Sequence, residues 1–593
     1  MPPTTENGGS GGGGSELATR VEEAEWDEAR DEGYDEFGDD WEDGSEEGSA
    51  WTDEDAQEGE YASDDGEEGG DPYEGDGGMD DDEEDSSDLA TTDTDSTSGN
   101  EMRLPHLESQ DVELLPAFAQ RRARLAAAGK DVGAHLVSFS LSHDRRRDPP
   151  REGDCPHKLF FRIEGASSNC VRNAWRRAGF ERTSKGGWNL WWGRPLKFPE
   201  HKKLNENQKV CHFPGTYYLG RKDNLARNVS KFRRSNGSAS YPYLPVTYIL
   251  PDDRARLLQD WRDRGERGLY IVKPKASARG QGIRLVAKPD VEIKKGASVL
   301  VQRYIDNPLL IDDRKFDMRV YVLVTSFDPL RVYVFKEGLA RFCSEKYHGA
   351  NGKVSHYKSK LKHLTNYSLN KKNAAVEEEG DGEGIKWSLS YLKERLASMG
   401  HDPRPIFERV DDLIVRTLLS VEDKINANMG MYVPHRGNCF ELFGFDVMLD
   451  DALHPWLIEV NTSPSLATEW QLDKRIKNQL SVDMFNILGV CGYSRQALKA
   501  RAEAPKKDTN FADRLRKQEV ATGRRAPLSS LTEGDAELLR ESDEEQALAG
   551  CFARVFPAPG SDRYLPLFAS QRYSNVLLNA WQQTPRAQRP PLP

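Results

Sequence analysis

The chain has 593 residues, enough for about two to four domains, and its net charge of −16 is unevenly distributed. Residues 1–100 contain 38 of the 98 acidic side chains and two of the 82 basic ones, so residues 101–593 carry a net charge of +20. The N-terminus lacks a basic region followed by an apolar segment, no uncharged apolar run reaches ~18 residues, and the seven cysteines form no CxxC pair. These features argue against a signal peptide, a membrane span and a zinc site, and we expect a soluble intracellular protein.

Residues 1–150 are predicted to form a disordered acidic and Gly-rich tail followed by a linker. The first 100 residues contain too few apolar side chains to offset the entropy of folding. Aromatic residues such as Trp41 and Tyr61 lie among the acids. These aromatic residues leave open the possibility that the tail docks on a basic surface, although a solvated tail is the preferred interpretation.

Globular sequence begins near residue 155, and residues 155–205 are predicted to form a small α/β domain. The segment Trp188 to Trp192 is dense in large aromatic side chains, which indicates a packed core. The basic residues 101–593 predict a polyanionic partner. Nucleic acid is disfavoured because the aromatic residues lie in apolar strands and not on a basic platform. Residues 491–593 are predicted as a charged helical extension.

A strand ending at Lys273 leads into a loop of small residues that contains Arg279, Gly280 and Gly282. Glycines let backbone N–H groups approach phosphate oxygens closely, and Lys273 and Arg279 would supply positive charge. The loop is neither a Walker A sequence nor a Rossmann fingerprint. By itself this loop is weak evidence for a phosphate-binding site, since turns of this composition with a basic residue are common.

Two later strands carry candidate binding groups. Val299 to Ile305 could present backbone edges and the Gln302 amide to an adenine, although an ordinary core strand is the alternative. Lys315 to Tyr321 alternates charged and apolar residues, so Lys315, Asp317 and Arg319 share one face. Arg341, Thr365 and Asn366 add polar groups after strands, whereas His363 is interpreted as structural.

Residues 440–461 predict a β-hairpin with a metal site. Two apolar runs, Phe440 to Leu449 and Trp456 to Val460, flank a polar turn. If Leu449 faces Trp456, Asp446 lies opposite Glu459, and Asn461 shares the face of Glu459. Two carboxylates and an amide suit Mg²⁺. The alternative is a pair of strand-end carboxylates that face solvent.

The ordered motifs GRKD, KPKASARGQGI, VQRY, KFDMRVYV, HLTNYS, ELFGFD and IEVNTSPS resemble those of the ATP-grasp ligases, and within them the tubulin tyrosine ligase-like family. The resemblance covers about residues 158–490 and is closest to the glutamate-adding branch. It implies an ATP-grasp fold of the α/β (α+β) class. Residues 206–305 would form the central domain, and residues 306–490 the C-terminal domain with the magnesium site.

The resemblance also implies roles for individual residues. Phosphate ligands would be Lys222 and Lys273, with Arg279 and Gly280 in the loop over the phosphates. The adenine hinge would comprise Gln302, Arg303 and Tyr304, and Asp317 would add a nucleotide contact. The acceptor and amino-acid side would comprise Arg319, Arg341, Thr365 and Asn366. The magnesium ligands would be Asp446, Glu459 and Asn461, of which Glu459 and Asn461 would also act in catalysis.

The implied reaction is ATP-dependent and Mg²⁺-dependent addition of free glutamate to glutamates in acidic protein tails, above all those of tubulin or microtubules. Other acidic proteins are further acceptors in this interpretation. We expect a monomer in the cytoplasm and cytoskeleton, with the cilium, axoneme or basal body as candidate sites. Two alternatives stay open: a glycine or tyrosine ligase of the same family, and a microtubule-binding scaffold with an inactive ligase fold.

Overall fold

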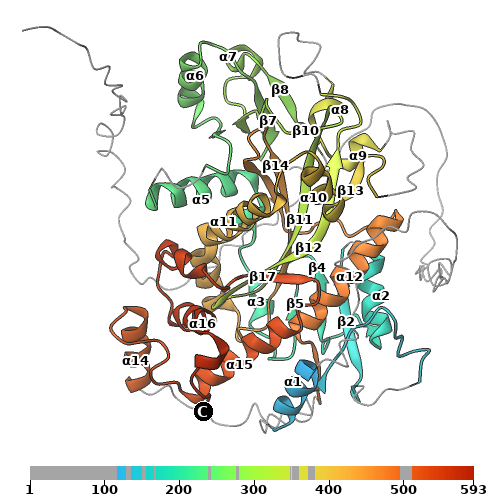
Figure 1. Cartoon of the computed structure of the whole chain (residues 1–593), viewed down its shortest axis with the longest axis vertical. Helices are drawn as coiled ribbons and strands as arrows, with labels where there is room; N and C mark the ends of the chain where they lie inside the picture. Colours follow the sequence, from blue (N-terminus) through green and yellow to red (C-terminus); the bar gives the residue numbers. More distant parts are fainter. Residues whose placement is uncertain are drawn as a thin grey trace, which may run out of the picture. The chain divides into compact units, whose positions relative to one another are not determined.

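The computed structural model describes residues 116–127, 135–149, 155–165, 168–237, 242–275, 280–347, 349, 359–371, 381–494 and 511–593. These residues lie within one unit, Ser96–Pro593. Residues 1–115 of the predicted tail lie outside the described residues, and so does Arg279. The predicted mixed α/β class is confirmed, since helices surround four separate sheets (Figure 1). Within the described residues, no helix combines the length and the apolar composition needed to cross a membrane.

The largest sheet has seven strands in the order β13-β12-β11-β14-β15, with β10 paired to β11 and β17 paired to β12. All its pairs are antiparallel. Its strands are β10 (Leu310–Ile311), β11 (Arg314–Phe327), β12 (Leu330–Phe342), β13 (Lys386–Ser388), β14 (Glu441–Leu449), β15 (Pro455–Asn461) and β17 (Phe552–Phe556). The central strands β11 and β14 are buried nearly throughout, which explains their continuous apolar runs.

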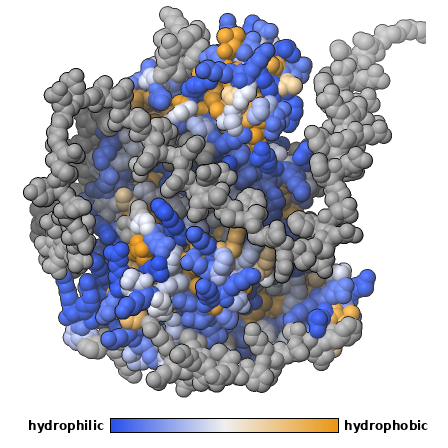
Figure 2. All heavy atoms as spheres, turned by 180° about the vertical axis from the view of Figure 1, so that it is seen from behind, coloured by the Kyte–Doolittle hydropathy of each residue, from blue (hydrophilic) through white to orange (hydrophobic). Residues whose placement is uncertain are grey.

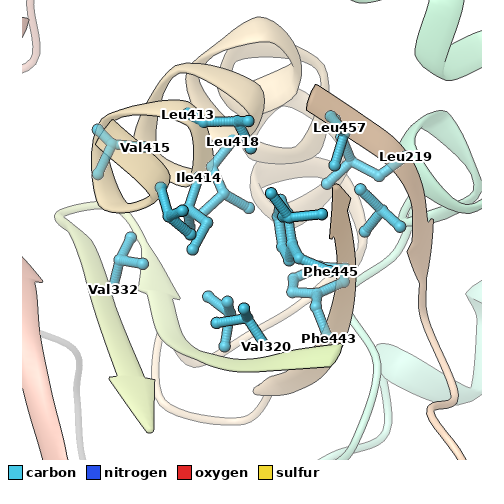
Figure 3. Packing of buried hydrophobic residues seen from close by; sticks show 14 of the residues in the cluster. Leu219, Val320, Val332, Leu413, Ile414, Val415, Leu418, Phe443, Phe445 and Leu457 are labelled. Carbon is cyan, nitrogen blue, oxygen red and sulfur yellow. The ribbon is translucent and has the colours of Figure 1, made fainter. Parts of the chain in front are cut away.

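The long helix α11 (Pro403–Tyr432) covers one face of this sheet. It begins at Pro403, and the Asp402 side chain accepts a hydrogen bond from the Arg404 N–H at 3.0 Å. Its apolar residues recur at helical spacing, as in Ile406, Val410 and Leu413. Figure 3 shows Ile414 and Leu418 of this helix above residues of β11, β12 and β14. Helix α10 (Leu389–Ser398) packs beside it.

A second, antiparallel sheet has the order β6-β9-β7-β8. Its strands are β6 (Thr247–Ile249), β7 (Tyr270–Pro274), β8 (Arg284–Val286) and β9 (Val299–Arg303). Helix α6 (Arg254–Asp263) packs Leu257 and Trp261 against Tyr270 and Val301, and α7 (Pro289–Glu292) follows β8. Three short helices, α4 (Tyr217–Gly220), α8 (Lys360–His363) and α9 (Tyr367–Asn370), and the longer α5 (Lys222–Ser235) frame the functional region described below.

The third sheet is parallel, with the order β3-β2-β4-β5. It comprises β2 (Leu159–Glu164), β3 (Phe180–Arg182), β4 (Leu190–Gly193) and β5 (Lys209–Val210), with α2 (Asn169–Arg177) and α3 (Phe198–His201) between them. Trp175 of α2 packs on Phe485 of α12 (Gln471–Leu488), with ring centroids 5.4 Å apart. This contact joins the sheet to the rest of the unit.

The N-terminal part of the described chain packs on the rest of the unit, although the sequence predicted a tail and a linker there. Helix α1 (Pro116–Ala127) and strand β1 (His135–Leu136) are ordered, although they lie in the predicted tail and linker. Their residues Phe118 and Leu136 pack on Leu548, and β1 pairs with β16 (Cys491–Gly492). These partners are distant in the chain, so local composition could not reveal them.

Residues 511–593 contain more than the predicted helices. They form α14 (Phe511–Ala521), α15 (Glu533–Ala547), α16 (Tyr573–Gln583) and the 3₁₀ helices Ser561–Leu567 and Arg586–Gln588. They also include strand β17, which adds to the main sheet beside β12. Strand β17 adds to the predicted helical extension, because the short run Phe552–Phe556 completes an edge that only the folded sheet presents.

Candidate functional site

A cleft lies where the β6-β9-β7-β8 sheet meets the main sheet. It is lined by side chains and backbone from both: Lys273 and Gln302 on one side, and Asp317, Asp446 and Glu459 on the other. The other predicted site residues that line it are Lys222, Gly280, Arg303, Tyr304, Thr365 and Asn366. Apolar side chains such as Ile271, Ile283 and Met448 form the remaining walls. Motifs spread over some 240 residues of sequence therefore meet at one place.

An arginine–aspartate network forms the floor behind the cleft. Strand register places Asp317 opposite Arg341 and Arg319 opposite Asp446. The Arg319 guanidinium donates to both Asp446 oxygens, at 2.6 and 3.1 Å. Arg341 donates to both Asp317 oxygens, at 2.7 and 2.6 Å, and also reaches Asp446 at 2.8 Å. These fork-shaped contacts fix the two carboxylates in place.

The network sets the charge of Asp446. Burial alone would raise the pKa of this carboxyl, but Arg319 and Arg341 hold it well below its usual range. Asp446 is therefore ionised at neutral pH although it is only 2% exposed.

Two lysines approach the cleft from the opposite side. Lys222, the first residue of α5, places its Nζ 3.2 Å from a Glu459 oxygen. The Lys273 Nζ donates to Gln302 Oε1 at 2.9 Å, and the Gln302 amide nitrogen donates to Thr247 at 3.0 Å. Burial lowers the pKa of Lys273 to about 8. An anion in the cleft would stabilise the charged form of this buried ammonium group.

The predicted adenine hinge is only partly available to a ligand. The Arg303 side chain turns toward α6, where its Nε donates to Asp260 at 3.1 Å. The Tyr304 hydroxyl accepts a hydrogen bond from Lys315 Nζ at 2.8 Å and lies 2.8 Å from His363 Nδ1. The Gln302 amide is paired with Lys273 and Thr247, and the Arg303 and Tyr304 N–H groups donate to Val246 O and Leu269 O. The role of this segment in binding adenine therefore stays a prediction.

Lys315 and His363 line the cleft but were not among the predicted site residues. Lys315 is 2% exposed, and burial lowers its pKa to about 8. The alternation that placed it on the face of Asp317 was a usable signal. His363 had no comparable signal, since its contact with Tyr304 depends on the tertiary fold.

Gly280 of the glycine loop and the segment 363–370 lie against each other at the cleft. Gly280 and Gly282 have φ of 74° and 68°, the left-handed region that favours glycine. A Cβ at Gly280 would lie 2.9 Å from Leu369 and 3.0 Å from the Asn366 amide oxygen. The neighbouring Thr365 hydroxyl donates to Asp317 at 2.6 Å. Bulkier residues at position 280 would push these two segments apart.

The hairpin pairs Asp446 with Glu459 as predicted, but the register of the strands near the turn differs from the prediction. Leu449 faces Pro455 and not Trp456, which corrects the predicted register at the turn. A bulge at Ile458 restores the pairing of Asp446 with Glu459, and Ile458 itself lines the cleft. Bulges next to active sites commonly re-aim side chains in this way.

The three predicted metal ligands fit a hard cation. Glu459 is half-buried beside Lys222, and Asp446 retains lone pairs beyond those that accept from the arginines. The Asn461 amide nitrogen donates to Gly444 O at 3.2 Å, which makes its Oδ1 the acceptor atom. Two carboxylates and an amide oxygen are ligands that Mg²⁺ prefers. Arg319, Arg341 and Asn461 are not among the residues that line the cleft; the two arginines hold the lining residue Asp446, and Asn461 follows Glu459 by two positions on β15.

Known proteins resemble this chain over about two thirds of its length or more. A human protein named tubulin monoglutamylase TTLL4 is 37% identical over 456 residues, which cover 72% of this chain and 37% of the relative. A Mus musculus protein named tubulin polyglutamylase TTLL5 is 37% identical over 431 residues, which cover 68% of this chain and 32% of the relative. A Caenorhabditis elegans protein named tubulin polyglutamylase ttll-4 is 36% identical over 405 residues, covering 66% of each chain.

The chain spans about a third of the length of the human and mouse relatives. Residues 200–497 match the Tubulin-tyrosine ligase family, and this range includes every predicted site residue. Since the match covers half of the sequence, the chain belongs to the tubulin-tyrosine ligase family.

Proposed function

We propose that this protein is an ATP-dependent carboxylate–amine ligase with an ATP-grasp fold that adds glutamate to glutamates in acidic protein tails. The observation that carries the proposal is the convergence of Lys222, Lys273 and the Asp446–Glu459 pair in one cleft. Charged groups of both signs at this spacing suit a polyphosphate and its metal. The names of the aligned relatives, tubulin monoglutamylase and polyglutamylase, support glutamate as the added amino acid.

In this proposal an acceptor carboxylate attacks the γ-phosphate of ATP to give an acyl phosphate and ADP. The amine of free glutamate then displaces phosphate and forms an isopeptide bond. Lys222 and Lys273 hold phosphate oxygens, with Arg279 above them, and Gln302 orients the base. Arg319, Arg341 and Asp317 hold the polar groups on the acceptor side in one geometry. Positioning and charge neutralisation are the main sources of rate in phosphoryl transfer.

Mg²⁺ would be held by Asp446, Glu459 and Asn461, and it would neutralise charge that develops on the phosphates. The protein's own contribution is to keep Asp446 ionised and fixed between two arginines. The acceptor in this proposal is the Glu-rich tail of tubulin or of microtubules, which places the protein at the cytoskeleton. The +20 charge of residues 101–593 favours such an acidic partner.

Mass spectrometry of tubulin tests the proposal. Tubulin is incubated with the protein, Mg-ATP and an equimolar pool of glutamate, glycine and tyrosine. We expect increments of one glutamyl residue on internal tail glutamates. Glycyl or tyrosyl increments would contradict glutamate transfer and indicate another branch of the family.

A microtubule-binding scaffold with an inactive ligase fold is the competing function. The buried Lys273 argues against it, because burying an ammonium group is costly and an anion bound in the cleft would offset that cost. Absence of any amino-acid increment, with ATP still bound, would support the scaffold.

A further inference from the structure

Exposed aromatic and apolar side chains gather at one place on the surface. The surface seen in Figure 2 is mostly hydrophilic, with apolar residues in small groups. Of the six large apolar side chains exposed in the described part of the chain, three lie on elements that meet along α11. They are Phe198 (40%), whose ring stacks on Tyr432, Met431 (63%), which precedes Tyr432, and Tyr217 (46%), whose ring packs on Tyr218. With Tyr218 and Tyr432 they form a surface that we name the aromatic ridge. Exposed clusters of this composition mark interaction sites.

The C-terminal turns of α11 build the ridge as a continuous row. Lys424, Asn428 and Tyr432 are spaced four residues apart and therefore lie along one helix face. Each contacts a segment from outside the helix. Lys424 Nζ lies 5.0 Å above the Tyr218 ring, the Asn428 amide donates to Pro214 O at 3.3 Å, and Tyr432 stacks on Phe198 at 4.3 Å. Tyr217 and Tyr218 pack together at 4.5 Å.

Cations flank the ridge. Lys202 Nζ lies 5.7 Å above the Tyr432 ring, and Lys424 Nζ lies above the Tyr218 ring. Further exposed basic side chains flank α3 and α4 or lie on the following helix α5: Lys197, Lys203, Arg221 and Arg227. The carboxylates on α3, α4, α5 and the last three turns of α11 are Glu200, Asp223, Glu422 and Asp423. Asp223 is paired with Arg221 and Arg227, and Glu422 and Asp423 are paired with Arg572. The surface is therefore aromatic and net positive.

The ridge leads directly to the cleft. Tyr217 O accepts from the Arg221 N–H at 3.1 Å, and the next residue is Lys222, which contacts Glu459. Gly220 lies against Thr462, where a Cβ would be 2.8 Å from the threonine methyl carbon. Thr462 directly follows the predicted metal ligand Asn461. A chain lying on the ridge would thus reach the cleft beside β15.

We propose that the aromatic ridge is the docking surface for the part of the Glu-rich acceptor chain that flanks the glutamate to be modified. The assignment rests on the proposed function, which makes the acceptor acidic. The methylene groups of glutamate pack on the tyrosine and phenylalanine rings, while Lys202 and Lys424 pair with the carboxylates. The rigid rings lose little conformational entropy on binding.

Binding and turnover of a synthetic peptide test this docking surface. The probe is a labelled Glu-rich peptide of about 20 residues, long enough to span the ridge and the cleft when extended. The full-length ridge variant carries Lys202→Glu, Tyr217→Ser and Met431→Ser. The matched control carries Lys294→Glu, Val291→Ser and Leu515→Ser, which make the same charge change and remove two exposed apolar side chains outside the ridge.

We expect the ridge variant to bind the peptide at least tenfold more weakly without ATP, while the control binds like wild type. In the ligation assay the peptide KM should rise by a similar factor, with kcat and the ATP KM nearly unchanged. A minimal acceptor of two or three residues, too short to reach the ridge, should show no difference between the proteins.

The outcomes separate this proposal from the proposed function. Ridge-dependent peptide binding without any ligation by wild type would keep the docking surface and contradict glutamate transfer. Glutamate transfer by wild type with unchanged peptide affinity in the ridge variant would overturn the docking surface. Wild type that sediments as a dimer, with a monomeric ridge variant of unchanged affinity, would overturn it too and assign the ridge to a second copy.

Discussion

At the residue scale, Asp446 combines two requirements in one carboxylate. Its oxygens accept from Arg319 and Arg341, and its lone pairs also make it a candidate metal ligand. Removing the side chain would therefore leave two buried guanidinium groups without their partner. Loss of one member of a buried ion pair costs about 3–5 kcal/mol.

We predict that Asp446→Asn lowers the rate of ADP formation in the presence of acceptor and glutamate by at least ~100-fold, the scale of losing one electrostatic stabiliser. Because asparagine keeps the shape of the side chain, unfolding in denaturant should change less than in Asp446→Ala. Asp450→Asn on the same hairpin serves as the control and should retain activity. The Asp450 carboxylate accepts a hydrogen bond from the Trp456 indole and does not line the cleft. An active Asp446→Asn enzyme would exclude a role for this carboxylate in metal binding.

Lys273 leads to a prediction on pH. Burial lowers its pKa to about 8, so the empty cleft loses the ammonium charge as the pH rises through that value. Phosphate binding favours the protonated form, and ATP affinity should therefore decline above about pH 8, by up to tenfold per pH unit for one proton. Calorimetric titration of ATP would measure the slope. The Lys273→Met variant should bind ATP more weakly. Its ATP affinity should also fall less steeply with pH, since only Lys315, whose pKa is lowered to about 8, remains to titrate.

At the scale of elements, the segment from α8 to α9 connects three parts of the cleft. His363 contacts Tyr304 of the hinge, Thr365 donates to Asp317, and Asn366 lies against Gly280 of the glycine loop. Ser344 anchors it through two hydrogen bonds to the Asn370 side chain, at 2.8 and 2.9 Å. The segment thereby fixes the distance between the network and the loop.

We predict that Thr365→Val weakens catalysis by roughly tenfold, because a hydrogen bond to a charged group contributes about 1.5–3 kcal/mol. The valine keeps the shape of the threonine side chain but leaves one Asp317 oxygen without this donor. Thr365→Ser retains the hydroxyl and is the matched control. Steady-state kinetics in ATP and acceptor would show the effect, and equal loss in the serine and valine variants would contradict the hydrogen-bond explanation.

At the scale of the whole molecule, a buried ion pair ties the parallel sheet to the main sheet. His212 Nδ1 lies 2.8 Å from Glu441 Oε1 at the start of β14, and Nε2 lies 2.7 Å from Gly193 O at the end of β4. Both ring nitrogens face acceptors, so both donate and the imidazole is charged. Burial alone would lower the pKa of His212, but Glu441 raises it well above its ordinary value.

The raised pKa of His212 determines how the stability of the protein changes with pH. A raised folded-state pKa contributes stability that is complete below the unfolded pKa of about 6.5 and is lost as pH rises through the folded value. We predict that His212→Gln destabilises the protein by roughly 3–5 kcal/mol at neutral pH and by less at alkaline pH. His201→Gln is the control: burial lowers the pKa of His201, so its effect on denaturant unfolding should not change over this range.

Charge distribution gives a further prediction at this scale. Removal of residues 1–100 changes the net charge of the chain from −16 to +20. We expect the shortened protein to bind a Glu-rich peptide more tightly at low salt, with the difference vanishing at high salt as charges are screened. Fluorescence anisotropy would measure it, and equal affinities of the two proteins at low salt would refute the prediction.

The sequence by itself determined the family, the main strands and most residues of the cleft, because local periodicity and ordered motifs carry that information. The alternation in Lys315 to Tyr321 and the pairing of Asp446 with Glu459 are examples. Only the tertiary structure decided the bulge at Ile458, the turn of Arg303 toward Asp260, and the addition of β17 to the main sheet. It also placed the aromatic ridge, whose rings come from α3, α4 and α11. These features depend on contacts between residues far apart in the chain, and no local pattern specifies such partners.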